Sequence, residues 1–164
     1  MDISFDIINS EGDHVLVGLS YYDYETVSIF SSDPLTLTLF FYDVTLVREA
    51  GNGYVGYKTL FAISDTLARF LDENEDAVLC FYCDANTDVK RHNLKLLPQE
   101  YRSNLFSKMF DLYIKSHPQF SDFVNHRVEI EDQEDKKNRQ FAHFICRKAH
   151  EKAVAELGKQ LMQK

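Results

Sequence analysis

Three side chains that could perform acid–base or metal chemistry follow one apolar segment. The run 77–82 is continuous and bounded by turn residues, which predicts a strand buried on both faces. Asp84, Asp88 and His92 come after it, and loops at strand ends often carry catalytic groups. The two aspartates could hold Mg²⁺ while the histidine moves a proton. We favour the simpler alternative, in which Asp84 caps a turn and Asp88 caps a short helix over 89–97.

The spacing of the cysteines and glycines does not support a metal or cofactor site. Cys80 and Cys83 have the spacing of a redox or zinc pair, but a strand places residues three apart on opposite faces. Zinc would need further ligands, so we expect core cysteines and no cofactor. The glycines of 51–56 lack the spacing of a nucleotide-binding loop. His143 lies in a predicted strand, where we expect a hydrogen-bonded core or edge residue.

Charge is unevenly distributed along the 164 residues. Residues 1–88 hold 16 acidic and 3 basic residues, whereas residues 89–164 hold 10 acidic and 15 basic residues. The overall charge of -8 argues against tight nucleic-acid binding, although the basic C-terminal helix leaves a weak polyanion contact open. We expect the ligand or partner surface to include Arg91, Arg102, Arg147, Lys148, Lys152 and Lys159.

The first 50 residues have the apolar–polar alternation of strands. The pattern predicts strands over 3–7, 15–19, 25–30 and 35–47. Short polar turns separate them, so we expect an antiparallel meander. The alternation weakens near Asp43, which indicates a bulge or bend.

Helical spacing of apolar residues dominates the second half. It predicts a helix over 60–71 with Thr59 as N-cap, and another beginning at Pro98, a residue suited to the first helical position. A β-hairpin is expected over 126–146 and a helix from Ala149 onward. The sequence therefore predicts a single α+β domain over 1–164, with the helices packed on one face of the sheet.

Several segments together resemble an uncharacterised family of small bacterial proteins of unknown function. They are the helix from Asp65 to Leu71, the turn Asn74-Glu75, the strand end Tyr82-Cys83-Asp84, and 102–106. The sequence departs from the family at Met109-Phe110, which stands where the second aromatic residue of the long helix is usually tryptophan, and in its longer insert between Asp88 and Arg102. The resemblance implies an α+β fold and a bacterial origin, and brings no established activity, cofactor or catalytic residue.

The charge asymmetry, the 13% aromatic content and the lack of a convincing catalytic motif favour a non-enzymatic binding or interaction module. The alternatives are a divalent-metal hydrolase or nuclease using Asp84, Asp88 and His92, and a small-ligand binder. No apolar run approaches a membrane span and no signal peptide is evident, so we expect a cytoplasmic protein without a membrane partner. An unprotected edge strand and a broad aromatic face from Tyr101 to Tyr113 favour a homodimer, and a protein partner is the alternative.

Overall fold

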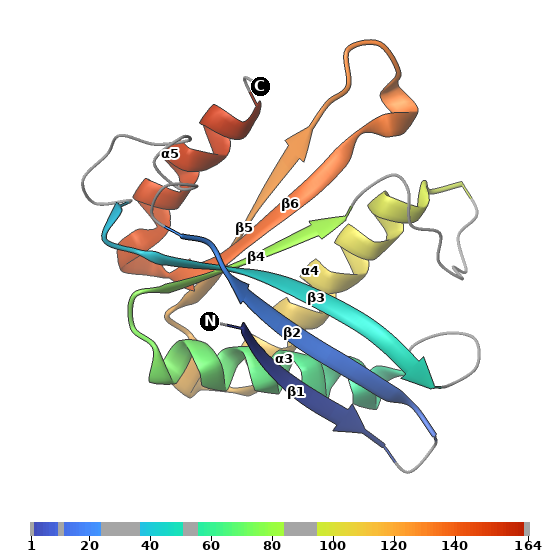
Figure 1. The fold of residues 1–164 in the computed structure, drawn as a ribbon, viewed down its shortest axis with the longest axis vertical. Coiled ribbons are helices and arrows are strands. Elements are labelled where there is room, and N and C mark those ends of the chain that lie inside the picture. The colour runs from blue at the N-terminus through green and yellow to red at the C-terminus, as the bar shows by residue number, and fades with distance from the viewer. Residues whose placement is uncertain (1, 10–11, 24–36, 51–55, 84–94, 163–164) are drawn as a thin grey trace.

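The chain forms one mixed β-sheet with helices packed against it (Figure 1). The structure is a computed structural model that describes residues 2–9, 12–23, 37–50, 56–83 and 95–162. Its six strands are arranged in the order β1-β2-β3-β4-β6-β5. The elements are β1 (Asp2–Ile8), β2 (His14–Tyr21), β3 (Phe40–Ala50), α3 (Tyr57–Glu73), β4 (Ala77–Cys83), α4 (Pro98–Ser116), β5 (Phe123–Ile130), β6 (Gln140–Arg147) and α5 (Glu151–Met162).

The antiparallel arrangement expected for the N-terminal strands is confirmed, because β1 pairs with β2 and β2 with β3. The strand predicted over 25–30 lies outside the described residues, and β3 begins at Phe40 rather than at residue 35. The predicted bulge at Asp43 is wrong, since Asp43 pairs in register with Ser20. The register instead shifts between His14 and Val15, near the end of β3.

A parallel pair, β3 and β4, interrupts the antiparallel order, and α3 connects the two strands. The predicted central strand is confirmed, because β4 lies between β3 and β6 and is largely buried. The N-cap of α3 is Gly56, so the assignment of Thr59 as N-cap was wrong. Thr59 is the third residue of α3, and its hydroxyl donates to Asp13.

The helices cover both faces of the sheet, which corrects the expectation of a single covered face. Helices α3 and α4 contribute Leu67 and Phe110 to one core cluster, whereas α5 contributes Val154 to a second cluster with Val128 of β5. The reason is that β6 is apolar on both faces, so its second face also needs a helix. Helix α5 approaches β5 closely at Gly158, where a Cβ atom would lie 2.8 Å from a methyl carbon of Val128.

The remaining local predictions for the second half are largely confirmed. Pro98 is at the start of α4 with Glu100 in the first turn, and β5 and β6 form the expected hairpin. The short helix predicted over 89–97 lies mostly outside the described residues, and 95–97 are not helical. No helix in the described part of the chain is long and apolar enough to cross a membrane.

Candidate functional site

The parallel strands β3 and β4 run side by side for only a short distance. Residues 40–43 of β3 pair with 77–80 of β4, after which β3 continues to Ala50 and β4 to Cys83. Figure 1 shows the two strands diverging toward their C-terminal ends. Ligands of open sheets containing parallel strands bind beyond the carboxyl ends of the strands, where the strand order changes. The divergence of β3 and β4 lies at the carboxyl ends of the parallel pair, next to the place where the order passes from β4 to β6.

Two hydrogen bonds show which peptide groups lie on the facing edges of β3 and β4. Tyr22 donates its N–H to the Phe41 carbonyl on the β2 side, and Phe40 donates to the Asp76 carbonyl on the β4 side. Successive peptide groups point to opposite strand edges, so those of Leu46 point toward β4 and those of Tyr82 toward β3.

Within the described residues, no strand pairs with these edges beyond Asp43 and Cys80. Leu46 and Tyr82 are themselves only half-buried. Since peptide groups removed from water need partners, the two edges suit a ligand that carries its own N–H and C=O groups.

A half-buried carboxyl, Asp43, lies where the two strands begin to part. Burial raises its pKa above the ordinary value, although the hydrogen bond donated by the Tyr22 hydroxyl opposes the rise. On β4, burial also raises the pKa of Tyr82 to about 12 and that of Cys80 well above its usual range. The cysteine and tyrosine are therefore neutral at physiological pH. Asp43 is left as the titratable group that can accept a proton or bind a cation here.

An internal anion occupies the first turn of α3. Asp13, from the β1–β2 turn, accepts hydrogen bonds from Thr59 at 3.1 Å and from Asn9 at 3.3 Å, and pairs with Arg48 at 2.8 Å. The hydrogen bond from Arg48 is the main cause that lowers the Asp13 pKa. A helix N-terminus favours one anion through its dipole and free N–H groups. Because Asp13 already supplies that charge, the arrangement disfavours a phosphate here.

A second polar cluster joins α4 to β5 and β6. The His143 ring lies 2.8 Å from the Ser103 hydroxyl and 3.0 Å from the Asn125 amide oxygen. A hydroxyl, an imidazole and an orienting amide have the connectivity of a nucleophile, its base and a positioning group. However, Ser103 and His143 have no exposed surface, and burial lowers the pKa of His143 to about 4. A substrate cannot reach this hydroxyl, so the cluster holds α4 on the sheet and confirms His143 as a hydrogen-bonded core residue.

The residues that the sequence grouped after β4 are not among those that the structure describes. Asp84, Asp88, Arg91 and His92 lie outside the described residues, so the metal-hydrolase hypothesis stays a prediction. The described residues hold no group of three or more potential metal ligands. Cys80 and Cys83 are buried, free thiols, which agrees with the expected core positions.

The predicted basic surface is dispersed over several elements. Arg102 is half-buried in α4, while Lys148, Lys152 and Lys159 are exposed at the C-terminal end of the chain. Arg147 packs its guanidinium over Phe123, 5.1 Å from the ring centre. It also donates to the carbonyls of Leu71 and Asp72 at the end of α3, which gives it a structural role.

Comparison with known proteins assigns no family: no family profile matches the sequence, and no curated protein is significantly similar to it. The candidate site therefore rests on geometry. Sequence reasoning missed Asp43 and Tyr22 as site residues and Ser103 as the partner of His143. A signal existed for Asp43, because it is the one acidic residue within the apolar segment 35–47.

Proposed function

We propose that the protein is a binding module that takes up an extended, basic segment of a partner polypeptide between β3 and β4. The observation that carries the proposal is the early end of the β3–β4 pairing, at Asp43 and Cys80. An extended peptide presents N–H and C=O groups at the spacing of a strand, so it can hydrogen-bond to the facing edges.

Charge selects the kind of segment. Residues 1–88, which supply β3 and β4, carry 16 acidic and 3 basic residues. Asp43 lies at the base of the divergence and Glu49 is exposed farther along β3. A basic segment is attracted to this region, whereas an acidic segment is repelled.

Binding of extended peptides of matched length but different charge tests the proposal. In fluorescence anisotropy at low salt, a basic peptide of about twelve residues should bind more tightly than a neutral peptide of the same length, and an acidic peptide should not bind. Leu46→Pro removes an N–H that points toward β4 without removing a β2–β3 hydrogen bond, so it should weaken binding while the chain still folds. Equal binding of all three peptides, or unchanged binding to a folded Leu46→Pro protein, would contradict the proposal.

The raised pKa of Asp43 favours a second candidate, acyl transfer from a pantetheine thioester. A pantetheine arm is an extended chain with amide groups, so it could also follow the strand edges. Asp43 would accept the proton of the amine that attacks the thioester carbonyl, and would return it to the pantetheine sulfur, which leaves as the thiol when the C–S bond breaks. The Asp13 carboxylate in the first turn of α3 argues against the phosphates of such a cofactor. Tight binding of coenzyme A that is weakened by Leu46→Pro, together with amine acylation that is lost in Asp43→Asn, would support this candidate over the peptide-binding one.

We also propose a bacterial origin, a cytoplasmic location and a homodimer. The homodimer rests on the strand order, because β1 and β5 form the edges of the described sheet. Light scattering at high micromolar concentration should give twice the chain mass of 19.1 kDa. A monomer mass would remove the homodimer and leave the protein-partner proposal in place.

A further inference from the structure

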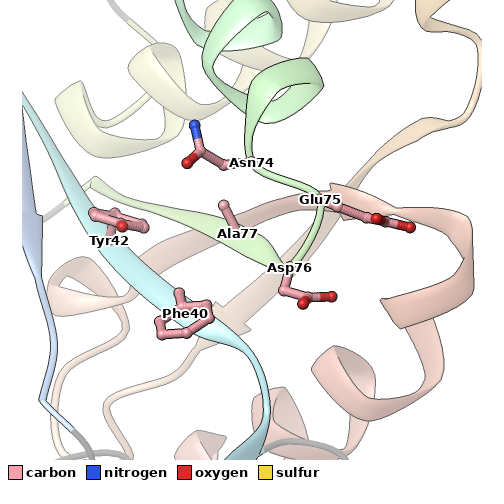
Figure 2. Close-up of a pocket in the computed structure, with 6 residues that line it drawn as sticks. All are labelled: Phe40, Tyr42, Asn74, Glu75, Asp76 and Ala77. Carbon is pink, nitrogen blue, oxygen red and sulfur yellow. The ribbon is translucent and has the colours of Figure 1, made fainter.

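A pocket of about 210 Å³ lies where α3 ends and β4 begins, away from the diverging ends of the strands. It is lined by Phe40 and Tyr42 of β3 and by the segment 74–77. Figure 2 shows the two aromatic rings together on one side, with the Asn74 amide near Tyr42 and Ala77 between the two chain segments. Phe40 keeps 49% of its surface exposed, so its ring is accessible to a ligand in the pocket.

Phe40 and Tyr42 form the aromatic wall of the pocket, and neighbouring aromatic rings pack against them. The Tyr42 ring meets Phe70 of α3 edge-on at a centroid distance of 5.1 Å, and Tyr21 lies 5.6 Å from it. Tyr21 also lies 6.1 Å from the Phe40 ring. The rings are therefore supported by neighbours, and the face of an aromatic ring attracts cations.

The end of α3 adds negative charge beside this wall. Asp72, Glu73, Glu75 and Asp76 surround a helix C-terminus that has no basic residue in its last turn. Cations are the charges that normally stabilise such an end, so this concentration of carboxylates departs from the rule. In Figure 2 the carboxylates of Glu75 and Asp76 extend away from the rings, so they attract a ligand through their field and not by direct contact.

Arg147 and the imidazole ring of His150 reach this region, where the four carboxylates outnumber them. Arg147 donates to the carbonyls of Leu71 and Asp72, and the His150 ring lies 3.6 Å from the Asp76 carboxylate. Both approach the carbonyl end of α3 and the α3–β4 connection, and neither lines the pocket.

The Asn74 amide supplies a directional acceptor. Its Nδ2 donates to the Phe70 carbonyl at 2.8 Å, which fixes the orientation of the amide. The amide oxygen is then turned toward Tyr42 in Figure 2. An N–H-bearing cation can donate to this oxygen while its charge lies against the rings.

We propose that the pocket lined by Phe40, Tyr42 and Asn74 binds a primary alkylammonium group. This site is separate from the divergence of β3 and β4 and does not depend on the function proposed there. The aromatic faces recognise the charge and the alkyl stem, the amide oxygen accepts from the ammonium, and the acidic end of α3 raises the local concentration of cations.

An NMR titration with n-butylammonium chloride tests the assignment, with 1-butanol as the neutral analogue and sodium chloride to match ionic strength. We expect n-butylammonium to shift the Ala77 amide and Phe40 ring signals, and 1-butanol to bind at least about fivefold more weakly. Phe40→Leu should weaken n-butylammonium binding by about fivefold, whereas Phe40→Tyr should retain it. The matched control is Tyr57→Leu, because Tyr57 is an exposed aromatic residue outside the pocket and its loss should change nothing.

Three results would overturn the proposal. They are equal binding of 1-butanol, unchanged n-butylammonium binding in Phe40→Leu, and the absence of saturable shifts at Ala77 and Phe40. Asp76→Asn tests the electrostatic attraction by the acidic end of α3. It should weaken n-butylammonium binding by about twofold at low salt and have little effect at high salt.

Discussion

Acid should destabilise the folded protein through one buried histidine, His143. Burial, reinforced by the nearby charge of Arg127, lowers its pKa from 6.5 to about 4. Below pH 6.5 the unfolded chain takes up a proton on this ring, whereas the folded protein does so only near pH 4. The contribution to stability is therefore complete above pH 6.5 and is lost as the pH falls toward 4. Linkage between the two pKa values gives a loss of about 2 kcal/mol near pH 5.

Urea unfolding followed by circular dichroism at about pH 7.5 and about pH 5 measures this loss. His143→Gln removes the titrating ring, so its free energy of unfolding should change with pH by about 2 kcal/mol less than that of the unmodified protein. The variant is also less stable at neutral pH, because Ser103 and Asn125 lose their partner. His126→Gln, on the neighbouring strand, is the control and should keep the full acid-dependent loss. An unchanged pH dependence in His143→Gln would refute the reasoning.

Three further substitutions test individual contacts, each by urea unfolding. Asp43→Asn should raise the free energy of unfolding at neutral pH by less than about 1 kcal/mol, because it removes a charge that burial disfavours while the amide oxygen still accepts from Tyr22; a loss of stability would contradict this. Thr59→Val should destabilise by about 1–2 kcal/mol through the loss of its bonds to Asp13 and Asn9. Thr66→Val, which loses only a bond to a carbonyl within α3, should cost less than about 0.5 kcal/mol. Arg147→Met should cost about 1–2 kcal/mol, because the end of α3 loses a donor, whereas Lys152→Ala at an exposed position should cost almost nothing.

The elements that could be predicted are those set by local sequence. The continuous apolar run 77–82 identifies β4, because a strand covered on both faces has few polar positions. Pro98 marks the start of α4, because its missing N–H costs nothing at the first helical position. The apolar alternation of β1 and β2 likewise places one of their faces in the core.

The features that could not be predicted depend on pairing between distant segments. A local pattern does not tell whether β3 and β4 run parallel, or that their pairing ends at Asp43. Ser103 and His143 are 40 residues apart, so their hydrogen bond follows from the packing of α4 on β6. The second apolar face of β6 is visible in the sequence, but the helix that covers it is fixed only by the three-dimensional arrangement.

Amide hydrogen exchange at Leu46 and Tyr82 tests the central claim most directly. In the free protein, the Leu46 amide points toward β4 and should exchange faster than its neighbours Thr45 and Val47, whose amides face β2. A bound basic peptide should slow exchange at Leu46 and Tyr82 by at least about tenfold and leave Thr45 and Val47 unchanged. Slow exchange at Leu46 and Tyr82 in the free protein, or peptide binding that leaves both amides unprotected, would contradict the account.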